Sequence, residues 1–344
     1  MDPSAATMPP SPYQYRFLRQ APRDGSTMQL RVQSRWARLH LDGWLLGLLL
    51  LTASVGLLTL YSASGQNWAL VLKQSISFLI AFSFMAVLAQ IPPRLYQAFS
   101  PWFYAVGLAL LLLTKLVGEV RLGAQRWLDV PLVGSVQPSE FMKLAMPMMV
   151  AWFLSRHPLP PRLPQVLMAL ALIGGPAVII AEQPDLGTAV LVASSGIFVL
   201  FLAGLNWGLI AACGAALAAF IPVAWTYLLH DYQKQRVLTL IDPEADALGT
   251  GWNIIQSKTA IGSGGWIGKG YLQGTQSHLD FLPERHTDFV IAAFSEEFGL
   301  FGFCLLMLLY LVLMGRALNI AAHALDSYSR LLAGAISLSF FVYV

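Results

Sequence analysis

The sequence predicts an all-α polytopic membrane protein with about nine membrane-spanning helices. Of its 344 residues, 56% are hydrophobic and 11% are charged, whereas a soluble domain carries about 25% charged residues. The mean hydropathy is +0.62, and several apolar runs approach the roughly 20 residues that a helix needs to cross a bilayer. The formal net charge of +3 is too small to indicate nucleic-acid binding.

Nine apolar runs are candidate spans. They are Trp44–Tyr61, Val71–Ile91, Trp102–Val117, Phe141–Leu154, Leu167–Ala181, Thr188–Leu205, Leu209–Leu229, Phe289–Leu313 and Leu331–Val344. The fourth run is short, and we expect Ser139 and Glu140 to supply its N-cap and first turn. The ninth run has 14 residues, so we expect the sequence to stop inside that span, as a fragment that is inactive or poorly stable alone.

The arginines set the expected orientation. Residues 1–43 form a polar tail with six arginines, which places it in the cytoplasm, and residues 44–344 form the membrane domain. Counting spans from that tail also puts the later arginine-containing loops inside, namely those with Arg94, Arg156, Arg162, Arg316 and Arg330. The loops left outside are Ser62–Leu70, Gly118–Pro138, Glu182–Gly187 and the large loop of residues 230–288.

Three loop segments have distinctive compositions. Gly123–Val130 mixes Trp and Leu with charges, as an interfacial segment does, and Trp252–Lys258 has the pattern of a short amphipathic helix. The run Gly262–Gly270 looks like a phosphate-cradling loop but departs from the Walker A pattern, so a flexible loop is favoured. Cys213 and Cys304 lie in apolar runs and are expected to be small core residues.

Four charged residues are expected on the outer face. Lys143 opposes the dipole of its own helix N-terminus, so an anionic partner is expected, either Asp288 or a bound anion; the alternative is that it snorkels to the surface. Asp185 is an N-cap or a catalytic residue. Lys73 is an interfacial anchor or a substrate contact.

The stretch Phe281–Phe289 joins the large loop to the eighth span and contains Glu284, Arg285, His286 and Asp288. His286 relays protons or caps the helix, and no second His or Cys has the spacing of a metal site. Glu296 and Glu297 follow about 12 Å deeper along a continuous helix. They need partners from other helices, in a structural network or a substrate contact.

Several motifs occur together and in order: Phe281–Glu297, Gly123–Val130, Gln137–Lys143, Gln183–Thr188 and Asp242–Gly265. On these the chain resembles the SEDS glycosyltransferases, and their elongation branch, RodA, more than the division branch, FtsW. The division branch usually has Ala at the position of Arg285. The resemblance implies a fold of ten helices in the bacterial inner membrane.

The resemblance also implies an activity: polymerisation of lipid II into peptidoglycan at the periplasmic face during cell elongation. It implies a class B penicillin-binding protein as partner, within the elongation machinery. The family's essential acid matches Asp288, its buried basic residue Lys143 and its second acid Asp185. Lys73 and Trp127 also fall at family positions.

Lipid II polymerisation joins a C4 hydroxyl to an anomeric carbon and releases undecaprenyl pyrophosphate. It needs a base and positive charge for the leaving group. Asp288 suits the base, and Lys143 the pyrophosphate, with Lys73 or Arg126 as further cations. The proposed substrate-binding residues are Asp185, Lys73, Arg126, Trp127, Glu284 and His286. A divalent cation such as Mg²⁺ or Mn²⁺ is compatible with this chemistry, but the sequence shows no ligand cage. The alternatives are a lipid II flippase and a non-catalytic scaffold.

Overall fold

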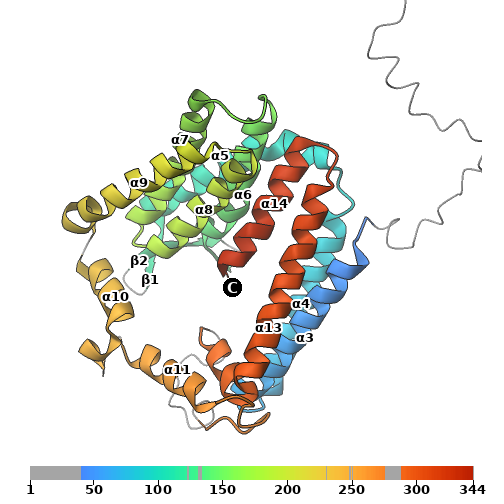
Figure 1. Ribbon diagram of the computed structural model, residues 1–344, viewed down its shortest axis with the longest axis vertical. Helices are drawn as coiled ribbons and strands as arrows, with labels where there is room; N and C mark the ends of the chain where they lie inside the picture. Colours follow the sequence, from blue (N-terminus) through green and yellow to red (C-terminus); the bar gives the residue numbers. More distant parts are fainter. Residues whose placement is uncertain are drawn as a thin grey trace, which may run out of the picture.

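The computed structural model describes residues 40–121, 124–130, 134–229, 231–247, 249, 251–275 and 288–343. The α-helices are α3 (Gly43–Ala63), α4 (Trp68–Leu88), α5 (Pro93–Val117), α6 (Pro138–Ser155), α7 (Leu163–Glu182), α8 (Leu186–Leu202), α9 (Trp207–Val223), α10 (Asp231–Ile241), α11 (Trp252–Ser263), α13 (Val290–Ala322) and α14 (Ser327–Tyr343). A π-helical turn, Ala224–Leu228, continues α9, and a 3₁₀ turn, Pro243–Asp246, precedes α11. Figure 1 shows these elements.

The architecture confirms the prediction of an all-α protein that crosses a membrane several times. Within the described ranges, six helices are long and apolar enough to span a bilayer: α3, α4, α5, α7, α9 with its π turn, and α13. The helices α6, α8 and α14 have 18, 17 and 17 residues. The predicted helix at Trp252–Lys258 is present as α11, which continues to Ser263.

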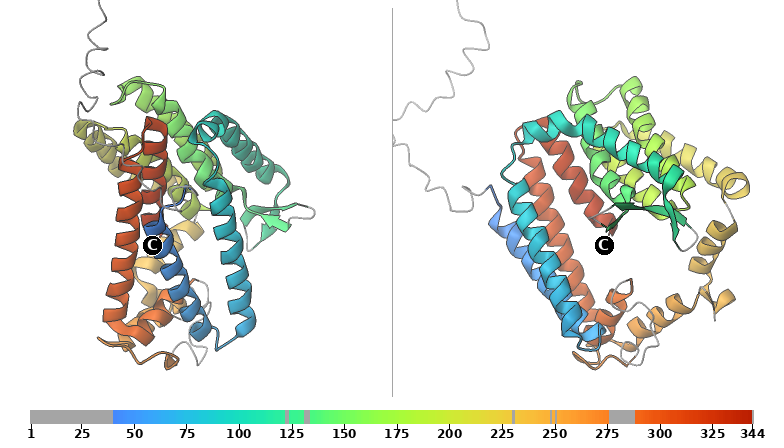
Figure 2. Two further views of the ribbon diagram at one scale, coloured as in Figure 1. Left: turned by 90° about the vertical axis from the view of Figure 1, so that its right-hand side faces the viewer. Right: turned by 180° about the vertical axis from the view of Figure 1, so that it is seen from behind.

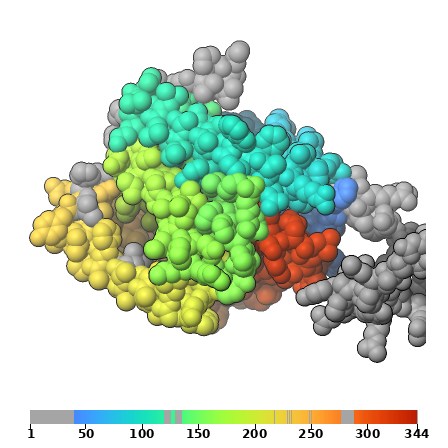
Figure 3. All heavy atoms as spheres, turned by 90° about the horizontal axis from the view of Figure 1, so that it is seen from above, coloured from blue at the N-terminus to red at the C-terminus, as the bar shows by residue number. Residues whose placement is uncertain are grey.

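The core lies around α6. Met142, Ala145, Met146 and Val150 of this helix are completely buried, in a cluster with residues of α5, α7, α8 and α14. Ten of the 18 residues of α6 are buried, although Leu144 is 58% exposed, so most of this helix faces protein. Seen from above, α5, α7 and α8 form one surface, and the C-terminal helices lie beside it (Figure 3). The N-cap of α6 is Gln137 followed by Pro138, so the expected cap at Ser139 is wrong, although Glu140 does lie in the first turn.

Most of the segment expected to be interfacial lies in a small sheet. The strands β1 (Glu119–Arg121), β2 (Ala124–Val130) and β3 (Gly134–Val136) pair antiparallel in that order. Trp127 on β2 lies opposite Glu119 on β1. The sheet stands at the edge of the helices, where β2 contacts α5 and α6 (Figure 2).

The eighth span is not one continuous helix. Gly299 has φ 64° and ψ −167°, a conformation that is essentially restricted to glycine. The helix α13 is therefore broken into a short first part, Val290 to Phe298, and a long second part that begins after Gly299. We call this feature the Gly299 break. Glu296 and Glu297 both precede the break and lie on the short first part of α13.

The glycine-rich loop after α11 packs on the Gly299 break. The amides of Leu300 and Phe301 donate to the carbonyls of Gly265 and Trp266 at 2.9 and 3.1 Å. A Cβ atom at Gly268 would lie 2.0 Å from the carbonyl oxygen of Glu297. The glycines therefore serve a close backbone approach, and the expectation of a flexible loop is wrong.

Both cysteines are free and exposed. Cys213 lies on α9 and Cys304 on α13. The expectation that they are core residues is therefore wrong for this fold, because an apolar run in a membrane protein does not distinguish a core face from a lipid-facing one.

Candidate active site

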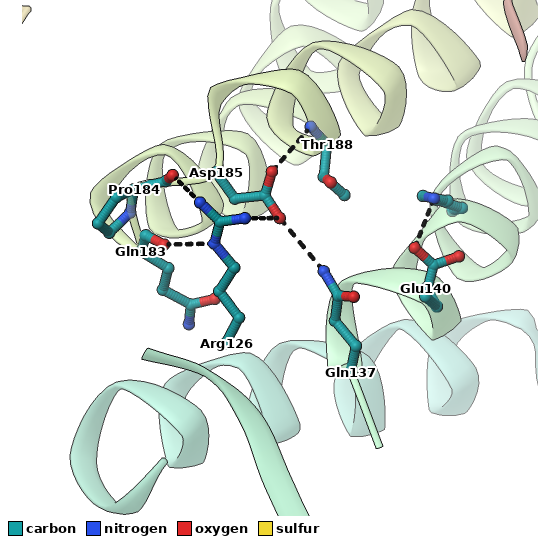
Figure 4. A network of polar contacts seen from close by, with 8 residues as sticks. Arg126, Gln137, Glu140, Gln183, Pro184, Asp185 and Thr188 are labelled. Atoms are coloured by element: carbon teal, nitrogen blue, oxygen red, sulfur yellow. Dashed lines mark hydrogen bonds and ion pairs between the residues drawn. The ribbon is translucent and has the colours of Figure 1, made fainter. Parts of the chain in front are cut away.

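The first turns of α6 and α8 lie next to each other at one end of the molecule. The side-chain amide of Gln137, the N-cap of α6, donates to Asp185 Oδ2 at 3.2 Å. Asp185 is the N-cap of α8 and accepts from the Thr188 amide through Oδ1 at 3.3 Å. Both helix N-termini therefore present their positive dipole ends at the same place. Figure 4 shows this pairing.

Arg126 connects the sheet to the turn between α7 and α8. Its Nη1 lies 3.7 Å from Asp185 Oδ2, and its Nε donates to the Gln183 carbonyl at 3.3 Å. Its Nη2 donates to the carbonyl of Pro184 (Figure 4). Three of its five N–H donors thus face protein oxygens, so Arg126 fixes this turn.

Gln183, in the same turn between α7 and α8, contacts α5. Its side chain is buried and donates to the carbonyl of Leu111 on α5 at 2.9 Å. The sequence analysis did not single out Gln183 as an individual contact. This hydrogen bond ties the turn between α7 and α8 to α5.

Lys143 lies one turn further along α6, with its side chain 17% exposed. Its Nζ is 2.6 Å from Glu140 Oε1, and 4.9 Å from the centre of the Tyr343 ring on α14. The expected partner of Lys143 was Asp288 or a bound anion, but in the structure its carboxylate partner is Glu140. The spacing of three residues on a helix could have revealed this pair; nothing in the sequence pointed to Tyr343.

A cavity of about 330 Å³ opens beside Lys143, between α6, α8 and α14. Its polar lining consists of Glu140, Lys143, Ser195, Ser339 and Tyr343, and the remaining lining is apolar. We call it the Lys143 cavity. A cation at the wall of a largely apolar cavity, close to two helix N-termini, can stabilise a negatively charged group that enters.

Asp288 lies elsewhere. It is exposed and directly precedes Phe289, the N-cap of α13. The N-terminal end of α13 is at the lower end of the molecule, away from the end of α14 where Tyr343 meets Lys143 (Figures 1 and 2). The structure therefore does not bring Asp288 and Lys143 together. Glu284 and His286 lie outside the described residues.

The two remaining candidates are not part of this cluster. Lys73 is exposed on α4, and among the described residues no ion pair reaches its ammonium group. Trp127 is half-buried on β2. Within the described part of the chain, no three His, Cys, Asp or Glu side chains gather in a way that could hold a metal ion, so no step is assigned to Mg²⁺ or Mn²⁺.

Glu296 and Glu297 form a structural network at the Gly299 break. Glu296 is fully buried, and its Oε1 accepts from Lys269 Nζ at 2.7 Å and from the Thr275 amide at 2.8 Å. Glu297 accepts from the Ser62 hydroxyl of α3. Of the two alternatives, the structure shows the protein network. Lys269 is the partner that the sequence analysis missed.

Comparison with known proteins identifies the family of this chain. The family model described as cell cycle protein, FtsW/RodA/SpoVE, matches residues 36–344. The chain belongs to this family. It is 49% identical to the peptidoglycan glycosyltransferase MrdB of Escherichia coli strain K12 over 309 residues, which cover 90% of this chain and 83% of that protein. It is 33% identical to the probable peptidoglycan glycosyltransferase FtsW of Trichlorobacter lovleyi, over 83% of this chain and 77% of that protein.

Solved structures of the family have the same fold. A chain from a study of how a peptidoglycan synthase complex coordinates polymerization and crosslinking aligns with a TM-score of 0.74, at 26% identity, over 88% of this chain and 84% of that chain. The rod shape determining protein RodA of Thermus thermophilus aligns with a TM-score of 0.63, at 24% identity, over 88% and 83%. The predicted family and the predicted enzyme class, a peptidoglycan glycosyltransferase, are confirmed. The flippase alternative is not favoured.

Proposed function

We propose that this member of the FtsW/RodA/SpoVE family polymerises lipid II into glycan strands and releases undecaprenyl pyrophosphate. The observation that carries the proposal is the Lys143 cavity, in which an ammonium group lies beside the adjoining N-termini of α6 and α8. A pyrophosphate leaving group develops negative charge as its bond to the sugar breaks, and such preorganised positive groups stabilise that charge.

The reaction proceeds by direct displacement. Asp288 accepts the proton of the C4 hydroxyl of one disaccharide, the hydroxyl oxygen bonds to the anomeric carbon of the other, and the bond to the pyrophosphate breaks. One carboxylate that acts as a base, without a second that acts as a nucleophile, gives inversion at the anomeric carbon. Lys143 receives the leaving pyrophosphate. Asp185, Lys73, Arg126, Trp127, Glu284 and His286 are the proposed contacts to the rest of the lipid-linked substrates.

Because Asp288 and Lys143 lie apart in the structure, the proposed mechanism requires a conformational change. Both groups must reach one reacting centre, so the N-terminal end of α13 and the Lys143 cavity must approach each other when substrate is bound. A base need not be in place in the free enzyme, because catalytic contacts are often completed only in the substrate complex.

The proposed setting follows the distribution of arginines. Arg94 at the start of α5, Arg156 at the end of α6 and Arg316 in the last turns of α13 face the cytoplasm in this proposal, together with the N-terminal tail. The first turns of α6 and α8 then face the periplasm, where we place the active site in the bacterial inner membrane. A class B penicillin-binding protein is the proposed partner in cell elongation, supported by the synthase complex in the comparison.

The test is polymerisation of lipid II by the purified protein, alone and with a class B penicillin-binding protein whose transpeptidase is inhibited. Glycan strands resolved by length are the expected product. A parallel assay follows labelled lipid II across vesicle membranes. Transbilayer movement that depends on Asp288, without glycan strands, would restore the flippase alternative.

A further inference from the structure

Lys143 is held between two helices. On its own helix, Glu140 approaches its ammonium group at 2.6 Å. From α14, the Tyr343 ring approaches it at 4.9 Å, measured to the ring centre. Four residues of α14, including Tyr343, line the Lys143 cavity. The C-terminal end of α14 is therefore part of the wall of the candidate active site.

Glu140 alone is a weak restraint on Lys143. Its side chain is 57% exposed, against 17% for Lys143. An ion pair with one exposed partner contributes little, because the exposed partner remains solvated and mobile. The lysine side chain itself has four flexible carbon–carbon bonds, which allow its ammonium group to move. A second contact is needed to hold the ammonium group in one place.

The Tyr343 ring supplies such a contact. A cation within about 6 Å of an aromatic ring centre is attracted to the ring face, and the attraction grows when the cation is shielded from water. Lys143 meets both conditions. The ring approaches from the neighbouring helix, whereas Glu140 approaches along α6, so the two contacts together restrict the ammonium group and leave it at the cavity wall.

We propose that Tyr343 is a positioning residue that holds the Lys143 ammonium at the cavity wall, where it meets the pyrophosphate of the lipid-linked substrate. The inference rests on the proposed function for the role of Lys143. The contact itself rests only on the geometry of α6 and α14.

The test uses two substitutions and a matched control. Tyr343→Leu removes the ring and keeps an apolar side chain, and we expect kcat to fall about 2- to 30-fold, the range that corresponds to one cation–π contact. Tyr343→Phe keeps the ring and removes the hydroxyl, and kcat should stay within about 3-fold of the unaltered protein. A Phe variant as impaired as the Leu variant would overturn the ring contact.

The control is Tyr310→Leu. Tyr310 on α13 packs against Phe340 of α14, with ring centres 5.9 Å apart, so this change loosens the same helix without touching Lys143. We expect reduced thermal stability and an unchanged kcat of the folded protein. A kcat loss equal to that of Tyr343→Leu would mean that α14 packing, and not the position of Lys143, is responsible.

A double-mutant cycle with Lys143→Met separates the contact from the function. Melting temperatures in detergent should be non-additive for Tyr343→Leu and Lys143→Met, and so should affinities for lipid II. Additive effects on both measurements would overturn the proposal. Non-additive melting temperatures in a protein that neither binds nor polymerises lipid II would establish the contact and refute both the catalytic role and the proposed function.

Discussion

The Lys143 cavity and the Gly299 break both place charged side chains inside apolar helices, but they satisfy those charges differently. At the break, the buried carboxylate of Glu296 accepts three hydrogen bonds from Lys269 and Thr275, all within the protein. At the cavity, Lys143 has one half-exposed carboxylate, one ring and an open volume in front of it. A closed set of partners indicates a structural role, whereas an incomplete set beside a cavity indicates a ligand.

Removing the cation should separate activity from stability. For Lys143→Ala we expect polymerisation to fall about 100-fold or more, which is typical of losing a group that stabilises developing charge. The melting temperature should fall only by the small loss of the Tyr343 ring contact, because Glu140 remains solvated. The matched control is Lys115→Ala, which breaks the exposed pair with Glu182 at 2.5 Å and should leave polymerisation unchanged. Equal activity in the two variants would mean that Lys143 is only a surface anchor.

Removing the buried carboxylate of Glu296 should mainly lower the stability of the protein. Glu296→Ala leaves the Lys269 ammonium and the Thr275 amide without their acceptor, and the unfolding free energy should fall by about 2–3 kcal/mol. That value is below the usual cost of breaking a buried pair, because Lys269 keeps contact with solvent. Thermal or denaturant unfolding in detergent measures it. A stable variant that no longer binds lipid II would move Glu296 from the structural group to the substrate site.

The contrast between these regions also shows what the sequence could predict. Hydropathy located α3, α4 and α7 because each is a continuous apolar run. The N-cap position of Asp185 followed from its place before Leu186-Gly187-Thr188, and the structure shows that cap. These features depend on short-range sequence pattern.

The missed features depend on contacts between distant segments. The Gly299 break is a backbone conformation stabilised by the loop at Gly265 and Gly268. Hydropathy is averaged over a window of residues, so it does not reveal the backbone angles of a single glycine. The contact of Lys143 with Tyr343 joins helices 200 residues apart in the sequence. For Asp288, the resemblance supplied the proposed role, whereas the structure supplied only its position.

The smallest effect is expected at the opposite end of the helices. Arg316 donates to Asp42, the N-cap of α3, and this hydrogen bond holds the pKa of Asp42 below its ordinary value of 3.8. A lowered pKa in the folded state stabilises the protein above the unfolded pKa, and this stabilisation is lost as the pH falls through the folded pKa. Asp42→Asn keeps the helix cap and removes the charge. Its melting temperature should be slightly lower at neutral pH and approach that of the unaltered protein below about pH 4.

A difference that persists unchanged at low pH would show that the charge of Asp42 is not involved. A decrease larger than that of Glu296→Ala would show that this partly exposed ion pair, and not the buried network, dominates the stability of α3 and α13.

The most direct test of the central claim is lipid II polymerisation by Asp288→Asn, because the proposed reaction needs a base that asparagine cannot replace. We expect kcat to fall by about 10²- to 10⁴-fold, with an unchanged melting temperature, since Asp288 is exposed. The control is Asp326→Asn, a change at another exposed aspartate, which precedes α14 and should retain activity. Glycan strands of normal length, made at the normal rate by a well-folded Asp288→Asn protein, would contradict the mechanism.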